Sequence, residues 1–403
     1  MARLAQSRRG VTPAADDYPA LVTYPGLPRR IRKVGAPLAV IIVLGTVTGL
    51  IVIGLTAANP VGTGIGFALS SVAMTIVVLA YLWLDRWEPE PPRLLTLAFL
   101  WGASVAVVIS TILQLTLEAA INPGQPETVS PVSIVLGAPL TEEAAKGLFL
   151  LVMMTGRRRN ELNSLTDCLV YAGLIGTGFA WLEDILYIGG GKSVSESLLT
   201  AALRLIMAPF AHPLFTTMTG IGVYFALQQR NAAAKVGFIL LGYLAAVIMH
   251  GLWNGSSLLG VGAYFGVYVF WMVPIFALAV VLGVRSRRRE QQVVASKLPG
   301  MVTAGLVTPN EATWLGSIRA RKLAIGEARR LGGRPAAKAV NNFAAQVVEL
   351  AFVRDRIDRG FGDQRVFALQ TDEAYGVYAA RAAAPVLQSM AGYRAPGAYP
   401  ARF

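Results

Sequence analysis

The chain has little of what a soluble enzyme normally carries: few charged residues, one cysteine and two histidines. Of its 403 residues, 15% are charged and 54% are hydrophobic, whereas about 25% of the residues in a soluble domain are charged. The single cysteine, Cys168, excludes an internal disulfide and a cysteine-rich zinc site. The HExxH motif of soluble zinc proteases is also absent. The composition therefore predicts an integral membrane protein.

Positive charge is in excess, but it is unevenly distributed. The formal net charge is +13, concentrated at the N-terminus, in short loops and in the C-terminal part. Such clusters suit a membrane surface. Because no nucleic-acid-binding motif accompanies them, we expect the lipid bilayer and no nucleic acid as a partner.

Eight apolar runs are long enough to span a bilayer, which takes about 20 helical residues. We therefore expect an all-α fold class, a polytopic bundle of about eight transmembrane helices. The expected spans lie near residues 36–57, 62–84, 94–116, 132–155, 167–188, 200–227, 236–257 and 260–284.

Arginine and lysine mark one side of this bundle. They cluster before the first span and after the fourth, sixth and eighth spans, while the intervening loops are poor in positive charge. With eight spans, all four clusters fall on one side, which the positive-inside rule assigns to the cytoplasm. We expect a multi-pass protein of the plasma membrane with both termini in the cytoplasm.

The remainder of the chain is polar enough to be soluble. A capping-box pattern at Thr308 and Glu311 predicts a helix that runs to Gly332. Further helices are expected around residues 343–350 and 370–384. The expected organisation is a flexible basic cytoplasmic N-terminus over 1–35, a membrane core over 36–284, a cytoplasmic helical region over 285–393 and a disordered tail over 394–403.

The fourth run contains three ionisable residues in the sequence 142-EEAAK-146. Glu142 and Lys146 are four residues apart and share a helix face, while Glu143 is rotated by about 100°. An ion-paired trio that only fixes helix packing is one interpretation. It does not account for the second carboxylate, and intramembrane ionisable residues are usually functional.

The three runs that follow add further acids and both histidines. Glu183 and Asp184 are adjacent in the fifth run. Arg204 and His212 are eight residues apart in the sixth run and fall roughly on one helix face. A position at the membrane interface would also explain Asp184, and snorkelling would explain Arg204. The seventh run contains His250.

Depth in the bilayer is compatible with a meeting of these groups. At about 1.5 Å per residue, Glu142 and His212 lie roughly 15–18 Å below the outer ends of their spans. Glu183 and His250 lie roughly 20–25 Å above the cytoplasmic ends of theirs. All four side chains can meet between the midplane and the outer leaflet.

Carboxylates and imidazoles at one depth suit a divalent cation such as zinc, or a water molecule activated by a carboxylate. A glutamate near such a water acts as general base, and an amide donor can stabilise the developing oxyanion. The residues expected to act in catalysis are Glu142, Glu143, Lys146 and Asn254, and those expected to hold the metal are Glu183, His212 and His250. The presence of the metal and the choice of base between Glu142 and Glu143 remain open.

At these residues the sequence resembles the PrsW family of intramembrane proteases, distant relatives of the CAAX prenyl and bacteriocin-immunity-type membrane proteases. The family motif EExxK is similar to Glu142–Lys146, and FxxxE to Phe179–Glu183. Further similarities are 211-AHPLFT-216, the pair His250 and Asn254, and 84-LDRWEPEPP-92. The sequence departs from the family at Asp184, where Asn is expected, and at Asn254, where some members have Asp. The resemblance covers roughly residues 36–284.

The resemblance implies an intramembrane endopeptidase that cleaves a membrane-anchored regulator, such as an anti-sigma factor, near its extracytoplasmic side. Two other functions are compatible with membrane carboxylates and histidines. One is a proton- or metal-coupled transporter, although no internal repeat typical of transporters is visible. The other is a catalytically inactive membrane scaffold.

Overall fold

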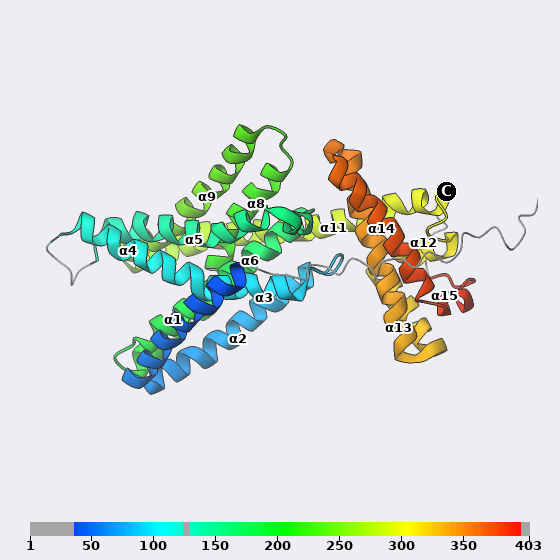
Figure 1. Cartoon of the computed structure of the whole chain (residues 1–403). Helices are drawn as coiled ribbons and strands as arrows, with labels where there is room; N and C mark the ends of the chain where they lie inside the picture. Colours follow the sequence, from blue (N-terminus) through cyan, green and yellow to red (C-terminus); the bar gives the residue numbers. More distant parts are fainter. Residues whose placement is uncertain (1–35, 124–128, 396–403) are drawn as a thin grey trace, which may run out of the picture.

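The computed structural model describes residues 36–123 and 129–395 (Figure 1). The predicted flexible N-terminus and all but two residues of the predicted disordered tail lie outside this part of the chain. Within it all regular structure is helical and no strand occurs, which confirms the all-α class.

The helices of the membrane core follow one another with short connections. They are α1 Ala36–Ala58, α2 Pro60–Leu84, α3 Pro92–Leu100, η1 Trp101–Ala106, α4 Val107–Ile121, η2 Ser133–Gly137, α5 Ala138–Met153, η3 Gly156–Glu161, α6 Leu165–Gly189, α7 Val194–Ala201, η4 Ala202–Met207, α8 Ala211–Leu227, α9 Ala232–Leu258, α10 Val261–Val267, η5 Tyr268–Met272 and α11 Val273–Thr303. The segments η1, η2, η4 and η5 are π-helical turns within longer helices.

Among the residues that the structure describes, seven continuous or nearly continuous helical stretches are long and apolar enough to cross a membrane. The helix formed by η2 and α5 has a similar length, but its three charged residues make it more polar than these seven. The described residues thus contain seven apolar spans where about eight were predicted, and the helix of η2 and α5 is the fourth predicted span, which is too polar to be counted with them.

The sixth predicted span is broken just before His212. The η4 segment ends at Met207, and α8 begins at Ala211. Pro209 explains the break, because proline has no backbone N–H and disfavours helical backbone at the residue before it. Accordingly, Ala208 has left the helix, with φ −126° and ψ 35°. His212 is therefore placed in the first turn of α8.

The last membrane helix extends well beyond the predicted end at residue 284. The stretch Val261–Thr303 has 43 residues, or about 65 Å at 1.5 Å per residue, twice the hydrocarbon thickness of a bilayer. Helix α11 therefore leaves the membrane and connects the bundle to the C-terminal helices. These helices form a separate group at the C-terminal end of α11 (Figure 1).

Helix α6 forms the centre of the membrane bundle (Figure 1), and nearly all its side chains are buried. Its close packing on α3 and η1 depends on small residues. A Cβ atom at Gly102 would lie 1.9 Å from the carbonyl oxygen of Ile175, and one at Gly178 would lie 1.9 Å from that of Phe99. The two backbones therefore touch, as is typical of membrane helix interfaces.

The C-terminal helices have a hydrophobic core of their own, which includes Trp314, Phe343 and Val347. They are α12 Pro309–Leu315, α13 Ile318–Arg356, η6 Ile357–Phe361, α14 Gln364–Ala382 and α15 Val386–Ser389.

The capping box at Thr308 and Glu311 is present, but the single helix predicted from there to Gly332 is wrong. Ser317 caps a new helix after α12. This new helix, α13, contains a kink at Gly332 and Gly333, where Gly333 has φ +71°.

Candidate active site

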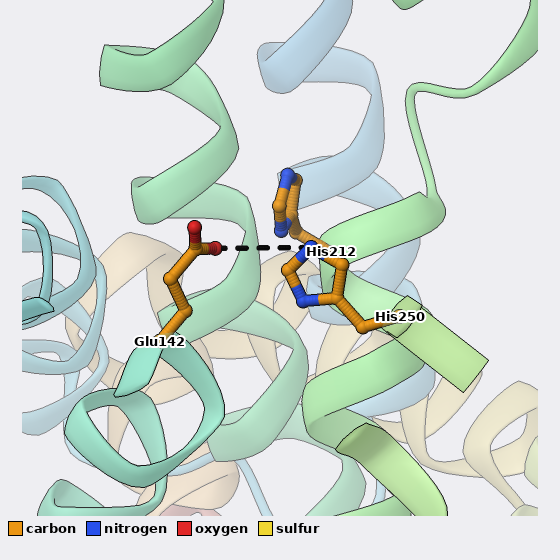
Figure 2. A group of neighbouring side chains, drawn as sticks. All are labelled: Glu142, His212 and His250. Carbon is orange, nitrogen blue, oxygen red and sulfur yellow. Dashed lines mark ion pairs between the residues drawn. The ribbon is translucent and has the colours of Figure 1, made fainter. Parts of the chain in front are cut away.

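Helices α5, α6, α8 and α9 bring six of the seven predicted site residues into one buried cluster. Figure 2 shows Glu142 of α5, His212 of α8 and His250 of α9 pointing toward one another. The Nε2 atom of His250 lies 3.9 Å from Oε2 of Glu142, and the centroids of the two imidazole rings are 5.1 Å apart. Segments distant in sequence therefore converge as predicted.

Lys146 lies at the centre of the cluster and is fully buried. Its Nζ is 3.3 Å from Oε2 of Glu142, 2.9 Å from Oε1 of Glu143 and 3.0 Å from Nδ1 of His212. It also lies 3.7 Å from the centroid of the Phe179 ring. The ammonium group thus pairs with two adjacent acids, although its single charge balances only one of them, and, as a donor only, it makes Nδ1 of His212 an acceptor.

The two glutamates of α5 have different surroundings. Glu143 is completely buried, with Oε1 3.1 Å from Nδ1 of His250 and Oε2 accepting a hydrogen bond from Oγ1 of Thr216 at 3.3 Å. Glu142 accepts a hydrogen bond from Nε2 of Gln114 at 3.2 Å. Glu143 therefore fixes the ring orientation of His250, whereas Glu142 faces both histidines.

Glu183 and Asp184 form a second acidic pair around one arginine. Arg204 donates to both carboxylates, and Nε2 of His212 lies 2.6 Å from Oε2 of Glu183. Asp184 is 3% exposed. The side chain of Arg204 is 27% exposed, so the two residues form a partly buried ion pair. Arg204 and His212 lie on either side of the helix break in the sixth span, and both contact Glu183.

The first turn of α8 can approach α6 because of Gly176. A Cβ atom at this position would lie 2.6 Å from the carbonyl oxygen of His212 and 2.7 Å from Cα of Pro213. The absent side chain thus allows backbone contact at the residue that carries the imidazole. Packing of Phe179 against His212, with ring centroids 5.1 Å apart, further restrains the ring.

Asn254 is the predicted site residue that lies outside the cluster. Its amide nitrogen donates to the carbonyl oxygen of Ile134 in η2, at 3.1 Å. It therefore connects α9 to η2, one helical turn beyond His250. The predicted oxyanion role of Asn254 remains a prediction that these contacts do not support.

Three of the clustered side chains can serve as metal ligands. One donor atom from each of Glu142, His212 and His250 lies within 4.8 Å of the others. Two histidines and a glutamate are a ligand set of catalytic zinc sites. Both histidines also have a carboxylate on another ring nitrogen, the arrangement that orients metal-bound histidines. The ligand chemistry therefore fits a divalent cation.

The net charge of the cluster also favours a divalent cation. Four carboxylates face two cations, so two negative charges remain when both histidines are neutral. A divalent cation, or protons on both histidines, would balance this buried charge. The residues counted are Glu142, Glu143, Glu183, Asp184, Lys146 and Arg204.

Two polar residues of the cluster were missed from the sequence. They are Gln114 and Thr216, and each stands in an apolar helical run. Thr216 is one turn after His212, and a search for polar residues at helical spacing from each histidine would have found it. No such signal leads to Gln114.

A polytopic helical bundle with buried acids, a lysine and histidines defines a class, membrane proteins with an intramembrane acid–base site. Comparison with known proteins shows which family this region resembles. A family model described as PrsW family intramembrane metalloprotease matches residues 90–279, the region that contains the whole cluster. The predicted resemblance to the PrsW family is thereby confirmed, and residues 90–279 are the PrsW-like part of a membrane protease.

Three similar proteins are named after this family. The chain is 26% identical to Protease PrsW of Geobacillus kaustophilus, over 46% of this chain and 76% of the relative. It is 25% identical to Protease PrsW of Oceanobacillus iheyensis, over 52% and 91%, and 23% identical to that of Bacillus subtilis, over 56% and 97%. No solved structure matches the chain.

Proposed function

We propose that the chain is an intramembrane endopeptidase that hydrolyses a peptide bond of a membrane-anchored protein. The observation that carries this proposal is the cluster around Lys146, in which two acid pairs and two histidines from four helices meet within the PrsW-like region. All of these side chains except that of Glu183, which is half-buried, are buried. Burying so many ionisable groups is costly, and packing alone does not require it.

We assign the metal to Glu142, His212 and His250, and expect zinc. Glu183, a metal ligand in the sequence prediction, is instead held by Arg204 and Nε2 of His212, so it is better suited to orient His212. When bound, such an ion supplies a Lewis acid that polarises the scissile carbonyl and acidifies water.

With Glu142 assigned as a ligand, Glu143 remains as the general base. A carboxylate in this role takes a proton from the attacking water and passes it to the leaving amine. Lys146 and His250 contact Glu143 at 2.9 and 3.1 Å, so they fix the direction of its oxygens. Thr216 restrains the second oxygen.

The proposed side of cleavage is the extracytoplasmic half of the bilayer, with both chain termini in the cytoplasm. The basic loops after the fourth and sixth spans mark the cytoplasmic side. Counted along the described helices from that side, Glu183, His212 and His250 lie about 22–27 Å away, most of the way across a hydrocarbon core of about 30 Å. A single-pass regulator such as an anti-sigma factor would be a suitable substrate.

The test is cleavage of a single-pass substrate by the purified protein in nanodiscs. We expect Glu142→Gln, Glu143→Gln and His250→Ala each to reduce the rate at least 100-fold, as loss of an acid–base group does. Glu196→Gln, an exposed glutamate on α7, is the matched control and should cleave normally.

Full cleavage by all three cluster variants would overturn the proposal. Ion uptake that requires Glu183, without any proteolysis, would favour the transporter alternative instead. Metal analysis of the same samples tests the cofactor: zinc should be present in the wild type and reduced in Glu142→Gln and His250→Ala.

A further inference from the structure

A polar cavity lies where the C-terminal helices meet the loops of the membrane core. It has a volume of about 470 Å³ and is bounded by η3, the turn between α8 and α9, and η6. It shares no residue with the cluster around Lys146 and therefore requires a separate explanation.

Positive charge dominates the wall of this cavity. Five cations line it, and the wall contains one carboxylate, which leaves four positive charges in excess. The residues are Arg159, Arg230, Lys235, Arg356, Arg359 and Asp363.

Two of the five cations have evident partners, because Arg230 donates to the carbonyl oxygen of Gly360 at 2.6 Å and Arg359 pairs with Asp355 at 2.8 Å. Arg356 lies among like charges. Burial, followed by the positive charges of Arg159 and Arg359, lowers the pKa of Arg356, and Asp363 only partly opposes this effect.

Apolar residues also line the cavity, near the point where the chain enters the membrane. Leu227, the last residue of α8, lines it together with Leu162 and Phe361. An occupant of the cavity would therefore meet both cations and apolar carbon near the end of a membrane span. Phospholipid headgroups at a membrane surface have this combination, and basic pockets at the cytoplasmic face are a known way to bind them.

We propose that this cavity binds a phosphate group, and that its place at the membrane surface makes the ligand the headgroup of an anionic phospholipid. An arginine guanidinium group suits a phosphate because two of its coplanar N–H groups can donate to two phosphate oxygens at once. Since the wall combines η3 and the α8–α9 turn with α13 and η6, a bound lipid would hold the C-terminal helices against the membrane core.

The test is thermal unfolding of the full chain in nanodiscs of phosphatidylcholine with increasing phosphatidylglycerol. We expect phosphatidylglycerol to raise the unfolding temperature of the wild type. Arg356→Gln and Arg159→Gln should each need about five times more of it for the same effect, the factor expected for one cation near an anionic surface. Arg334→Gln, at an exposed arginine outside this cavity, is the matched control and should behave as the wild type.

A second measurement separates loss of binding from loss of folding. In pure phosphatidylcholine, Arg356→Gln should unfold at or above the wild-type temperature, because it removes a charge repelled by its neighbours. If that variant does not fold, Lys235→Gln replaces it, with the same fivefold loss expected.

Equal stabilisation of the wild type by both lipids, or unchanged lipid dependence in the cavity variants, would overturn the site. Inorganic phosphate added to phosphatidylcholine nanodiscs distinguishes the source. Stabilisation by phosphate to the full extent seen with phosphatidylglycerol would overturn the assignment to a lipid. No effect of phosphate, with a clear effect of phosphatidylglycerol, would support it.

Discussion

Replacing Lys146 by methionine would test the central contacts of the cluster, because methionine has a similar length but no charge. The ammonium group lies 3.3 and 2.9 Å from the carboxylates of Glu142 and Glu143. At an effective dielectric constant of about 20, each attraction amounts to about 5–6 kcal/mol before desolvation is subtracted. Removing one partner of a buried ion pair typically costs about 3–5 kcal/mol in free energy of unfolding. We expect Lys146→Met to lose that amount without added metal.

A divalent cation should reverse much of this loss. Lys146 contacts two of the proposed metal ligands, Glu142 and His212, so the ammonium group and a metal ion compete for the same donor atoms. Without the lysine, the buried carboxylates lose a positive charge that zinc can replace. Zinc at about 100 times its dissociation constant would restore about 2.7 kcal/mol, and it should stabilise the variant more than the wild type.

The assay is thermal unfolding in detergent, with chelator or with increasing zinc, for the wild type, Lys146→Met and Lys192→Met. Lys192 is exposed on a loop, so Lys192→Met controls for the loss of one lysine. Wild-type stability of Lys146→Met in chelator would refute the argument from buried charge. Equal zinc stabilisation of the wild type and Lys146→Met would refute the competition between lysine and metal.

Three further predictions concern groups around the site. Burial raises the pKa of Glu90 well above its usual value near 4.5, so the folded state keeps a proton that the unfolded chain releases. Stability should therefore fall as pH rises from about 4.5 toward the folded-state pKa. Glu90→Gln should be the more stable form at pH 7 and should equal the wild type below about pH 4.5 in pH-dependent unfolding. Gly102→Ala should destabilise the protein by about 1–3 kcal/mol in thermal unfolding, since the new methyl group would lie 1.9 Å from a carbonyl oxygen of α6. Gly49→Ala, with open space around it, should change stability by about 0.5 kcal/mol or less. Arg204→Gln should lower the free energy of unfolding by about 3–5 kcal/mol in thermal unfolding, and adding Asp184→Asn should recover part of this loss. If the two substitutions instead lower stability by the sum of their separate effects, the pairing of Arg204 with Asp184 is contradicted.

The membrane bundle could be predicted from the sequence because a bilayer imposes a simple rule. Each span needs about 20 apolar residues with internally paired backbone groups, and the predicted runs correspond to the observed helices apart from the break in the sixth run and the longer end of the eighth. The rule does not fix where a helix ends in water. Helix α11 continues to Thr303, because nothing after residue 284 stops a helix that has left the membrane.

The membership of the cluster was more predictable than its contacts. Helical spacing placed Glu142 and Lys146 on one face, and the two are in contact. The resemblance paired His250 with Asn254, which are also four residues apart, yet His250 contacts α5 while Asn254 contacts η2. Residues four apart share a face but differ in depth by a full turn, so which helix each one meets depends on how helices cross. A single sequence does not contain that information.

The distribution of charge suggests why both histidines lie where they do. Each acidic pair has one cation: Lys146 serves the pair on α5, and Arg204 serves the pair on α6. One negative charge is therefore left in each half of the site. His212 contacts both halves, through Lys146 at Nδ1 and Glu183 at Nε2, and His250 contacts the pair on α5. Imidazoles in these positions can accept protons or a cation at the point where the uncompensated charge is greatest. Water attack and proton transfer in a low-dielectric medium require that capacity, whereas an inert ion pair would be better balanced without it.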